Sequence, residues 1–334
     1  MQADPQTHEE MILAFLADGG EEFTSGEALS DKLGLSRTAV WKHVESLRGK
    51  GYRIEAIPAR GYRLVEVPDH LTGLELSPLL GTRDIGRTLH ALEEVESTNA
   101  LAFKLANEGA VHGEVVVAET QTQGRGRRGR NWESPPGLNL YCSIVLRPEL
   151  PPQRAPELTL VAAVALAETI REAGVVATIK WPNDVYAEGK KVAGILTELS
   201  AEPDAIRFAI LGLGVNLNAR AEDFPPEVAK VATSLYEVRG QRVPRALFAA
   251  ALWSRLEVWL DRHAEEGFAP VRQAWRELCG MLGAEVLVKT ERREVRGVAE
   301  DIDETGALLV RTAQGVERVV AGDVEQLRAK KSAR

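Results

Sequence analysis

Cysteine is scarce in this chain, whose 334 residues include only Cys142 and Cys279. Two cysteines so far apart in the sequence cannot form the disulfide framework that holds small secreted domains together. Both lie in apolar surroundings, so we expect two buried free thiols. The sequence also has no cluster of cysteine and histidine residues, which argues against a structural zinc site.

Long apolar runs are absent as well. The most apolar stretch, Leu158 to Ala167, is interrupted by Thr159 and is far shorter than the roughly 20 residues that a membrane span requires. The first residues, Met1 to Pro5, lack the basic segment and the following apolar segment of a secretory signal. Hydrophobic residues make up 44% and charged residues 27% of the chain, a composition typical of soluble globular proteins. We therefore expect a cytoplasmic protein with no membrane contact.

The net charge of −8 argues against nonspecific nucleic-acid binding by the chain as a whole. Its length predicts two or three domains at about 150 residues each. Residues 1–68 have the pattern of a helix-turn-helix followed by a wing. A short helix from Ser25 to Leu33 stops at Gly34, and a second helix, capped by Ser36, continues to Arg48. Two alternating segments, 52–57 and 61–65, then predict a β-hairpin.

Positive charge is concentrated in this first segment. Between Ser36 and Arg63 there are seven lysines and arginines against two glutamates, a local excess of five positive charges. A basic helix and wing on an acidic protein indicate a domain that binds a DNA groove. The predicted contacts are made by Ser36, Arg37, Thr38, Lys42, His43 and Arg60. The alternative is a small helical packing module whose charges only solvate it.

Residues 69–280 alternate strands with helices, which predicts a layered α/β domain. The expected strands are 89–95, 114–119, 138–146, 177–181, 192–198 and 206–217, and the expected helices are 99–108, 157–173, 245–263 and 268–278. Residues 281–334 contain short strands with turns at Thr305-Gly306 and Gln314-Gly315, which suggest a small β-barrel.

The segment from Gly124 to Arg130 holds four arginines and three glycines in seven residues. Four guanidinium groups this close repel one another unless an anion lies between them, and glycine lets the backbone approach that anion. The segment formally matches a dinucleotide-binding fingerprint, which requires a helix at its third glycine. Pro135, Pro136 and Gly137 prevent such a helix, so we interpret the segment as a mobile, arginine-rich anion-binding loop.

Four further motifs occur in a fixed order. They are Ser97-Thr98-Asn99, Lys180-Trp181-Pro182-Asn183-Asp184, Lys191-Val192-Ala193-Gly194-Ile195-Leu196 and Gly212-Leu213-Gly214-Val215-Asn216. With the arginine-rich loop, these are motifs of the biotin–protein ligases, and the sequence resembles the bifunctional ligase/repressor members of that family from about Leu13 to Leu327.

The resemblance implies an α+β multidomain fold. It would consist of an N-terminal winged helix-turn-helix, a central ligase domain similar to class II synthetases and a C-terminal SH3-like barrel. The activity implied is the formation of biotinyl-5′-AMP from biotin and ATP with Mg²⁺, then transfer of biotin to a lysine of the biotin carboxyl carrier protein of acetyl-CoA carboxylase. A ligand-promoted homodimer would bind operator DNA and repress the genes of biotin synthesis.

The resemblance also implies roles for individual residues. Catalysis is expected from Lys191, Arg127 and Asp184, and Asp184 either orients a magnesium-linked water or accepts the proton of the incoming lysine. The residues expected to bind biotin are Ser97, Thr98, Asn99, Gln121, Arg125, Gly126, Arg127, Lys191 and Gly194. Those expected to bind ATP are Arg127, Arg128, Arg130, Trp132, Asn183 and Asn216.

Two other functions compete with this interpretation. A lipoate or octanoate ligase shares the catalytic core, but the arginine-rich loop together with the Lys180–Asp184 motif favours biotin. A ligand-sensing transcription factor without catalysis would not need Lys191 and Arg127, which are both present.

Overall fold

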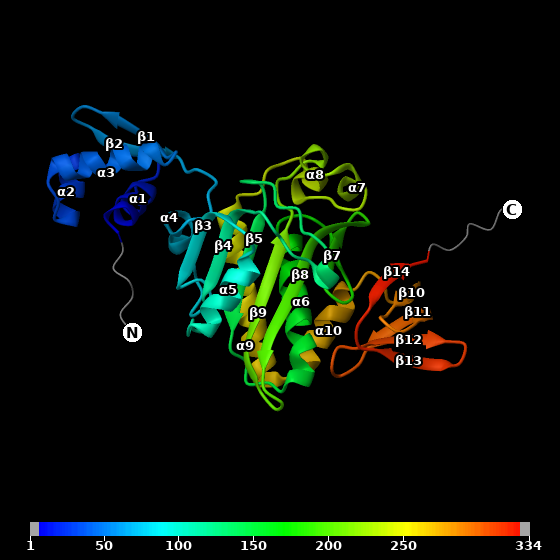
Figure 1. Ribbon diagram of the computed structural model, residues 1–334. Coiled ribbons are helices and arrows are strands. Elements are labelled where there is room, and N and C mark those ends of the chain that lie inside the picture. The colour runs from blue at the N-terminus through cyan, green and yellow to red at the C-terminus, as the bar shows by residue number, and fades with distance from the viewer. Residues whose placement is uncertain (1–6, 328–334) are drawn as a thin grey trace. The chain divides into compact units, whose positions relative to one another are not determined.

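The computed structural model describes residues 7–327, which form two compact units (Figure 1). The first unit ends at Leu79 and the second begins at Leu80. Met1 to Pro5, on which the expectation about a secretory signal rests, lie outside the described residues, as do the outer ends of the first and last predicted domains. No helix of the described residues is long and apolar enough to cross a membrane.

The first unit contains the predicted helix-turn-helix and hairpin. Its elements are α1 (His8–Asp18), α2 (Gly26–Leu33), α3 (Arg37–Gly49), β1 (Arg53–Ile57), β2 (Gly61–Glu66) and α4 (Gly73–Leu76). Ser25 and Ser36 cap α2 and α3 as predicted, and Gly34 ends α2 in the left-handed conformation at φ 65°. The sequence patterns did not predict α1 or α4.

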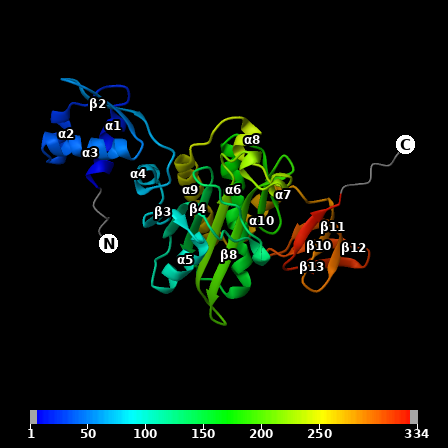
Figure 2. The same ribbon diagram turned by 45° about the horizontal axis from the view of Figure 1, so that its top comes forward.

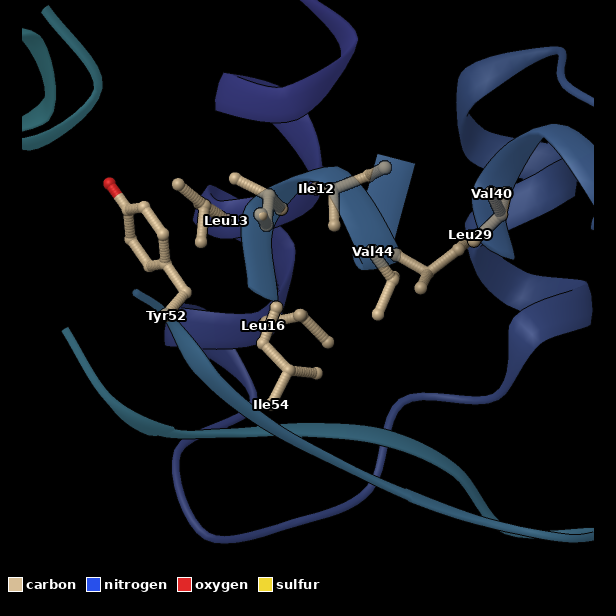
Figure 3. Packing of buried hydrophobic residues seen from close by; sticks show 9 residues of the cluster. Ile12, Leu13, Leu16, Leu29, Val40, Val44, Tyr52 and Ile54 are labelled. Atoms are coloured by element: carbon tan, nitrogen blue, oxygen red, sulfur yellow. The ribbon is translucent and has the colours of Figure 1, made fainter. Parts of the chain in front are cut away.

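A small apolar core holds this unit together. Figure 3 shows side chains of α1, α2, α3 and β1 meeting there, among them Ile12, Leu29 and Val44. Tyr52 lies at its margin, where its hydroxyl donates a 2.5 Å hydrogen bond to Glu75 of α4. Burial and this neighbouring carboxylate raise the pKa of Tyr52. The contact ties α4 to the helix-turn-helix, so this unit continues beyond its hairpin.

A seven-stranded mixed sheet forms the centre of the second unit. In spatial order its strands are β3 (Leu89–Val95), β4 (Val115–Gln121), β5 (Leu140–Leu146), β9 (Ile206–Val215), β8 (Lys190–Ala201), β7 (Asp184–Ala187) and β6 (Ala177–Lys180). Only the β3–β4 pairing is parallel among these neighbours. Figures 1 and 2 show α5 (Thr98–Asn107) on one face of the sheet.

Three long helices cover the other face: α6 (Ala155–Glu172), α9 (Arg245–Glu266) and α10 (Ala269–Leu278). Thirteen of the 18 residues of α6 are buried between the sheet and its helical neighbours, including all of those from Leu160 to Ala167, which explains the apolar sequence of this stretch. Two short helices, α7 (Pro226–Ala229) and α8 (Leu235–Arg239), follow β9. Because the helices fill one face of the sheet, a ligand site is left to the face that carries α5.

Three sequence-based expectations for this domain were incomplete. Strand β7 was not predicted, because four residues with Val185 and Ala187 buried give too short an alternation to recognise. Strand β8 begins at Lys190 rather than Val192. Cys142 is buried as expected, and burial raises the pKa of its thiol to about 12. Cys279, however, is only half-buried.

The C-terminal part of this unit is a five-stranded antiparallel sheet. Its strands, in spatial order, are β13 (Gly315–Val319), β12 (Leu308–Thr312), β11 (Glu294–Ile302), β10 (Glu285–Lys289) and β14 (Asp323–Gln326). Both predicted turns are present, and Gly306 has a positive φ of 82°. The Trp181 indole donates to the carbonyl of Gly306 at 3.0 Å, so this sheet is fixed to the central α/β domain beside the Lys180–Asp184 motif.

Candidate active site

A pocket opens on the α5 side of the central sheet, with a free volume of about 50 Å³. The start of α5, the end of β4, the arginine-rich loop and strands β8 and β9 all contribute to it. Most predicted ligand residues line this one pocket: Ser97, Thr98, Asn99, Gln121, Arg125, Gly126, Arg127, Trp132, Asn183, Lys191 and Gly194. Residues from five distant segments of the sequence therefore meet in one place.

The floor of the pocket is polar and tightly hydrogen-bonded. Ser97 caps α5 by accepting a bond from Ala100 N–H, as the sequence indicated. The buried hydroxyl of Ser143, on β5, lies 2.8 Å from Thr98 Oγ1 and 2.6 Å from Asn99 Oδ1. Ser143 was missed by sequence reasoning, because a serine inside an apolar strand gives no signal that it supports the side chains lining a pocket.

Gly212 provides the space for this floor. A Cβ at this position would lie 2.1 Å from Asn99 Oδ1, so no other residue fits without displacing the amide. Gly212 is therefore required because the Asn99 side chain packs directly against strand β9. It is not required by the backbone, whose conformation at this position any residue can adopt.

The arginine-rich loop folds back on itself. Arg127–Gly129 form a short 3₁₀ turn, and no helix follows Gly129, as predicted from the prolines. Gly126 N–H donates to Arg130 O at 2.7 Å, and Trp132 N–H donates to Gly124 O at 2.9 Å. These bonds close the loop at its base and bring Trp132 to the pocket.

The three arginines at the tip of this loop differ in environment. Arg127 donates to Asn183 Oδ1 at 3.2 Å and to Gly322 O at 3.4 Å, and burial lowers its pKa. Arg128 and Arg130 both pair with Asp323 at the start of β14. The C-terminal sheet therefore neutralises part of the loop's charge, a role for Asp323 that its sequence neighbours do not indicate.

Lys191, on strand β8, lines the wall of the pocket that the sheet forms. Its ammonium is 2.6 Å from Asp184 Oδ1 and 5.2 Å from the centre of the Trp132 ring. Lys190 is exposed and donates to the Ala229 carbonyl, so strand alternation separates the two lysines as expected. Of this pair, only Lys191 lines the pocket.

Trp132 packs flat against two glycines of the sheet. A Cβ on Gly214 would lie 2.5 Å from the indole, and one on Gly194 would lie 2.9 Å from it. The indole N–H is buried and has no hydrogen-bond partner among residues 7–327. A buried donor without a partner is unfavourable, and it is the kind of group that a ligand acceptor satisfies.

Four predicted residues lie outside the pocket lining. Arg128 and Arg130 line a neighbouring hollow formed mostly by the loop itself. Asp184 does not line the pocket itself but pairs with Lys191, which does. The Asn216 side chain donates from Nδ2 to Thr233 O at 3.0 Å. Within the described part of the chain, Asn216 Oδ1 has no partner, and no group of three or more histidines, cysteines and acidic residues could hold a metal ion.

The predicted DNA-binding residues lie on α3 and the wing. Arg37, Thr38, Lys42 and Arg60 are exposed, but the Ser36 hydroxyl caps α3 and the His43 ring lies 5.5 Å from that of His8. Five of the seven basic side chains between Ser36 and Arg63 form ion pairs with acidic neighbours, which reduces the free positive charge: Arg37, Arg48, Lys50, Arg53 and Arg63. Sequence reasoning overlooked Trp41, which is 52% exposed on α3.

This combination of a polar pocket lined by basic side chains with a helix-turn-helix agrees with comparisons to known proteins. The model of the biotin/lipoate A/B protein ligase family matches residues 91–216. An HTH domain model matches residues 8–63, and the biotin protein ligase C-terminal domain model matches residues 281–326.

Among relatives, the bifunctional ligase/repressor BirA of Bacillus subtilis is 40% identical over 315 residues, which cover 94% of this chain and 97% of that protein. The protein of the same name from Escherichia coli is 34% identical, with 96% and 97% covered. A biotin protein ligase from Aquifex aeolicus, solved with biotin and ATP, superposes with a TM-score of 0.63 at 32% identity and covers 72% of this chain and 99% of its own. The chain belongs to the bifunctional biotin–protein ligase/repressor family.

Proposed function

We propose that this protein is an ATP-dependent biotin–protein ligase. It forms biotinyl-5′-AMP and pyrophosphate, then transfers biotin to one lysine of the biotin carboxyl carrier protein of acetyl-CoA carboxylase. The main support is the convergence of a polar floor, three cationic side chains and an aromatic side chain with an unsatisfied donor in a single pocket. We infer that the protein acts in the cytoplasm, because biotin, ATP and the carboxyl carrier protein are available there.

The chemistry follows from these groups. The biotin carboxylate attacks the α-phosphate of ATP, and pyrophosphate leaves while negative charge builds on the α-phosphoryl oxygens. Lys191 and Arg127 stabilise that charge because both are fixed before the reaction. Arg127 is held by Asn183, and Lys191 is held by Asp184.

The Asp184 carboxylate lies 2.6 Å from the Lys191 ammonium, and this contact supports a role for Asp184 in orienting Lys191. In the second step the same carboxylate is available to take a proton from the incoming lysine, whose nitrogen then attacks the acyl carbon of the mixed anhydride; the amide bond forms as the acyl–phosphate bond breaks and AMP leaves. Mg²⁺ would arrive bound to ATP and would neutralise part of the phosphate charge. In such sites the ion is held largely by substrate phosphates and water, so it needs few carboxylates from the protein.

A lipoate ligase is the rival enzyme. The floor residues Thr98, Asn99 and Gln121 suit a ligand ring that makes hydrogen bonds, whereas the dithiolane of lipoate offers no N–H or C=O group. Incubation with ATP, Mg²⁺ and an acceptor domain should give biotin transfer but no lipoate transfer, measured by intact-protein mass. Transfer of lipoate alone would reject the proposed substrate.

We also propose that the first unit binds operator DNA of biotin-synthesis genes, as a homodimer promoted by biotinyl-5′-AMP. The exposed face formed by Arg37, Thr38, Trp41 and Lys42 supports this role, because it offers cations for phosphate and an aromatic surface for bases. A gel shift with the upstream DNA of these genes, with and without biotin plus ATP, tests it. A chain beginning at Leu80 is the control, since it omits α4 together with the helix-turn-helix.

Two finer features of the fold are part of this proposal. The central domain would have a class II synthetase-like arrangement, and the C-terminal antiparallel sheet would be an SH3-like barrel. The pairing of β10 with both β11 and β14 supports the latter, because it brings the last strand back against the first.

A further inference from the structure

Arg60 lies at the tip of the wing, in the turn between β1 and β2. Of the seven basic side chains between Ser36 and Arg63, only those of Lys42 and Arg60 form no ion pair within residues 7–327. Arg60 is exposed, and in this described part of the chain its guanidinium makes no hydrogen bond either. It therefore keeps both its positive charge and its N–H donors for a ligand.

The aromatic ring of Phe23, in the segment between α1 and α2, contacts this guanidinium. Arg60 Cζ lies over the ring, 4.5 Å from its centre. The face of an aromatic ring attracts a cation, and phenylalanine has no polar side-chain atom that could accept a hydrogen bond from it. A carboxylate would also hold Arg60, but it would neutralise the charge and occupy the donors. The ring therefore restrains Arg60 while leaving it able to bind an anion.

Arg63 shares the same ring but differs from Arg60 in its other contacts. Arg63 Cζ lies 4.9 Å from the centre of the Phe23 ring. Its guanidinium also pairs with the Glu55 carboxylate at 2.7 Å and donates to the Glu21 carbonyl at 3.3 Å. Arg63 is thus held and neutralised by polar partners, whereas Arg60 depends on the ring.

The backbone fixes the ring beside the turn of the wing. Thr24 N–H donates to Tyr62 O and Tyr62 N–H donates to Thr24 O, both at 2.8 Å. Gly61 has a positive φ of 112°, and a Cβ there would lie 2.0 Å from Thr24 O, so the two backbones touch. Because Phe23 directly precedes Thr24 and Arg60 directly precedes Gly61, this bridge brings the two side chains together.

Arg60 lines a hollow between the wing and the first residues of α2 and α3. Arg37, at the start of α3, lines the same hollow, so the wing and the predicted DNA-binding helix present cations to one surface. Glu27 also lines it and lies 2.9 Å from the Arg37 guanidinium. Of the two arginines, Arg60 is therefore the one whose charge is not already paired.

We propose that Phe23 is a positioning residue for DNA binding, which holds the Arg60 guanidinium in place for a backbone phosphate beside the wing. The assignment rests on the proposed function of the first unit, because operator DNA supplies that phosphate. A restrained side chain loses less conformational entropy on binding than a mobile one, so the ring strengthens a contact that it does not make itself.

The test measures fluorescence anisotropy of labelled upstream DNA of biotin-synthesis genes with the full chain, biotin and ATP, at several salt concentrations. Arg60→Ala should reduce the slope of log affinity against log salt by about 0.9 for each protomer, because one phosphate contact is lost. Phe23→Leu keeps an apolar side chain without a ring face, and it should weaken DNA binding about two- to fivefold for each protomer. Phe23→Tyr keeps the ring face and should stay within about twofold of the parent.

The deciding measurement introduces Phe23→Leu into the Arg60→Ala variant, where it should cause no further loss of DNA affinity. The same loss in both backgrounds would assign Phe23 a merely structural role and overturn the proposal. Parental affinity in Phe23→Leu, or a parental salt slope in Arg60→Ala, would overturn it too. Phe23→Met provides the same comparison if the leucine variant does not fold.

Phe15→Leu is the matched control. It removes a second phenylalanine ring of this unit that contacts a cation, since Lys32 Nζ lies 4.3 Å from the centre of the Phe15 ring. This variant should bind DNA like the parent, and a loss equal to that of Phe23→Leu would count against a role specific to the wing. A parent protein that binds none of this DNA would instead reject the proposed repressor function.

Discussion

Substitution of Asp323 by asparagine should loosen the arginine-rich loop. Asp323 pairs with both Arg128 and Arg130, and these side chains are 30%, 32% and 61% exposed. Partly exposed ion pairs contribute about 0.2–1 kcal/mol each, so the two together hold the loop by about 0.5–2 kcal/mol. Their loss also leaves Arg128 and Arg130 without the carboxylate that they share, which adds repulsion between them.

Hydrogen–deuterium exchange of the ligand-free protein measures this effect directly. A free-energy change of this size corresponds to exchange faster by a factor of about 2–30 for the amides of Gly126 and Trp132, whose hydrogen bonds close the loop. High salt should reduce the difference between the two proteins, because it screens exposed pairs in the parent.

Glu325→Gln is the matched control. It removes one negative charge from the same strand. The partner of Glu325 is Lys289, whose ammonium is 2.8 Å from the Glu325 carboxylate and lies outside the loop. This variant should leave loop exchange unchanged. If Asp323→Asn exchanged at the parental rate, or if Glu325→Gln had the same effect, the loop would not depend on this pair of contacts.

Three further outcomes are expected. Lys191→Ala should lose about 2–4 kcal/mol of transition-state stabilisation, seen as a fall of kcat/KM for pyrophosphate release, and near-parental turnover would remove Lys191 from the mechanism. The hydrogen bond from Arg276 lowers the pKa of Asp301 to about 2, so its stabilising effect is present at neutral pH and is lost as pH falls from about 4 through 2; Asp301→Asn should therefore be less stable by about 1 kcal/mol at pH 7 and equal to the parent near pH 2 in urea unfolding. Cys142, buried and with a raised pKa, should resist iodoacetamide at pH 8 until the protein is unfolded, as mass spectrometry can show.

Local patterns predicted most of the elements of this fold. Capping serines, stop glycines and the spacing of Val40, Val44 and Leu47 indicate α2 and α3, and the structure confirms both helices. These signals act over one or two turns, so a single sequence contains them. Strand β7 was missed because its four residues are held by pairing with β6 and β8, and such tertiary contacts leave no local pattern.

The candidate site shows the same division. Motifs identified residues with suitable chemistry, such as Lys191 and Arg127, but they gave no information about what fixes each side chain. Asp323 reaches the loop from the C-terminal sheet, and Ser143 reaches the floor from β5. Both depend on packing between segments far apart in the sequence.

The glycines of the Gly212–Asn216 motif illustrate why function and packing are hard to separate here. Gly212 leaves space for the Asn99 amide and Gly214 leaves space for the Trp132 indole, so two neighbouring positions on one strand fix the polar floor and the aromatic wall of the pocket. These two glycines carry no functional group of their own. They determine which side chains from α5 and the loop can approach the sheet, and through those side chains the polarity and the shape that a ligand meets.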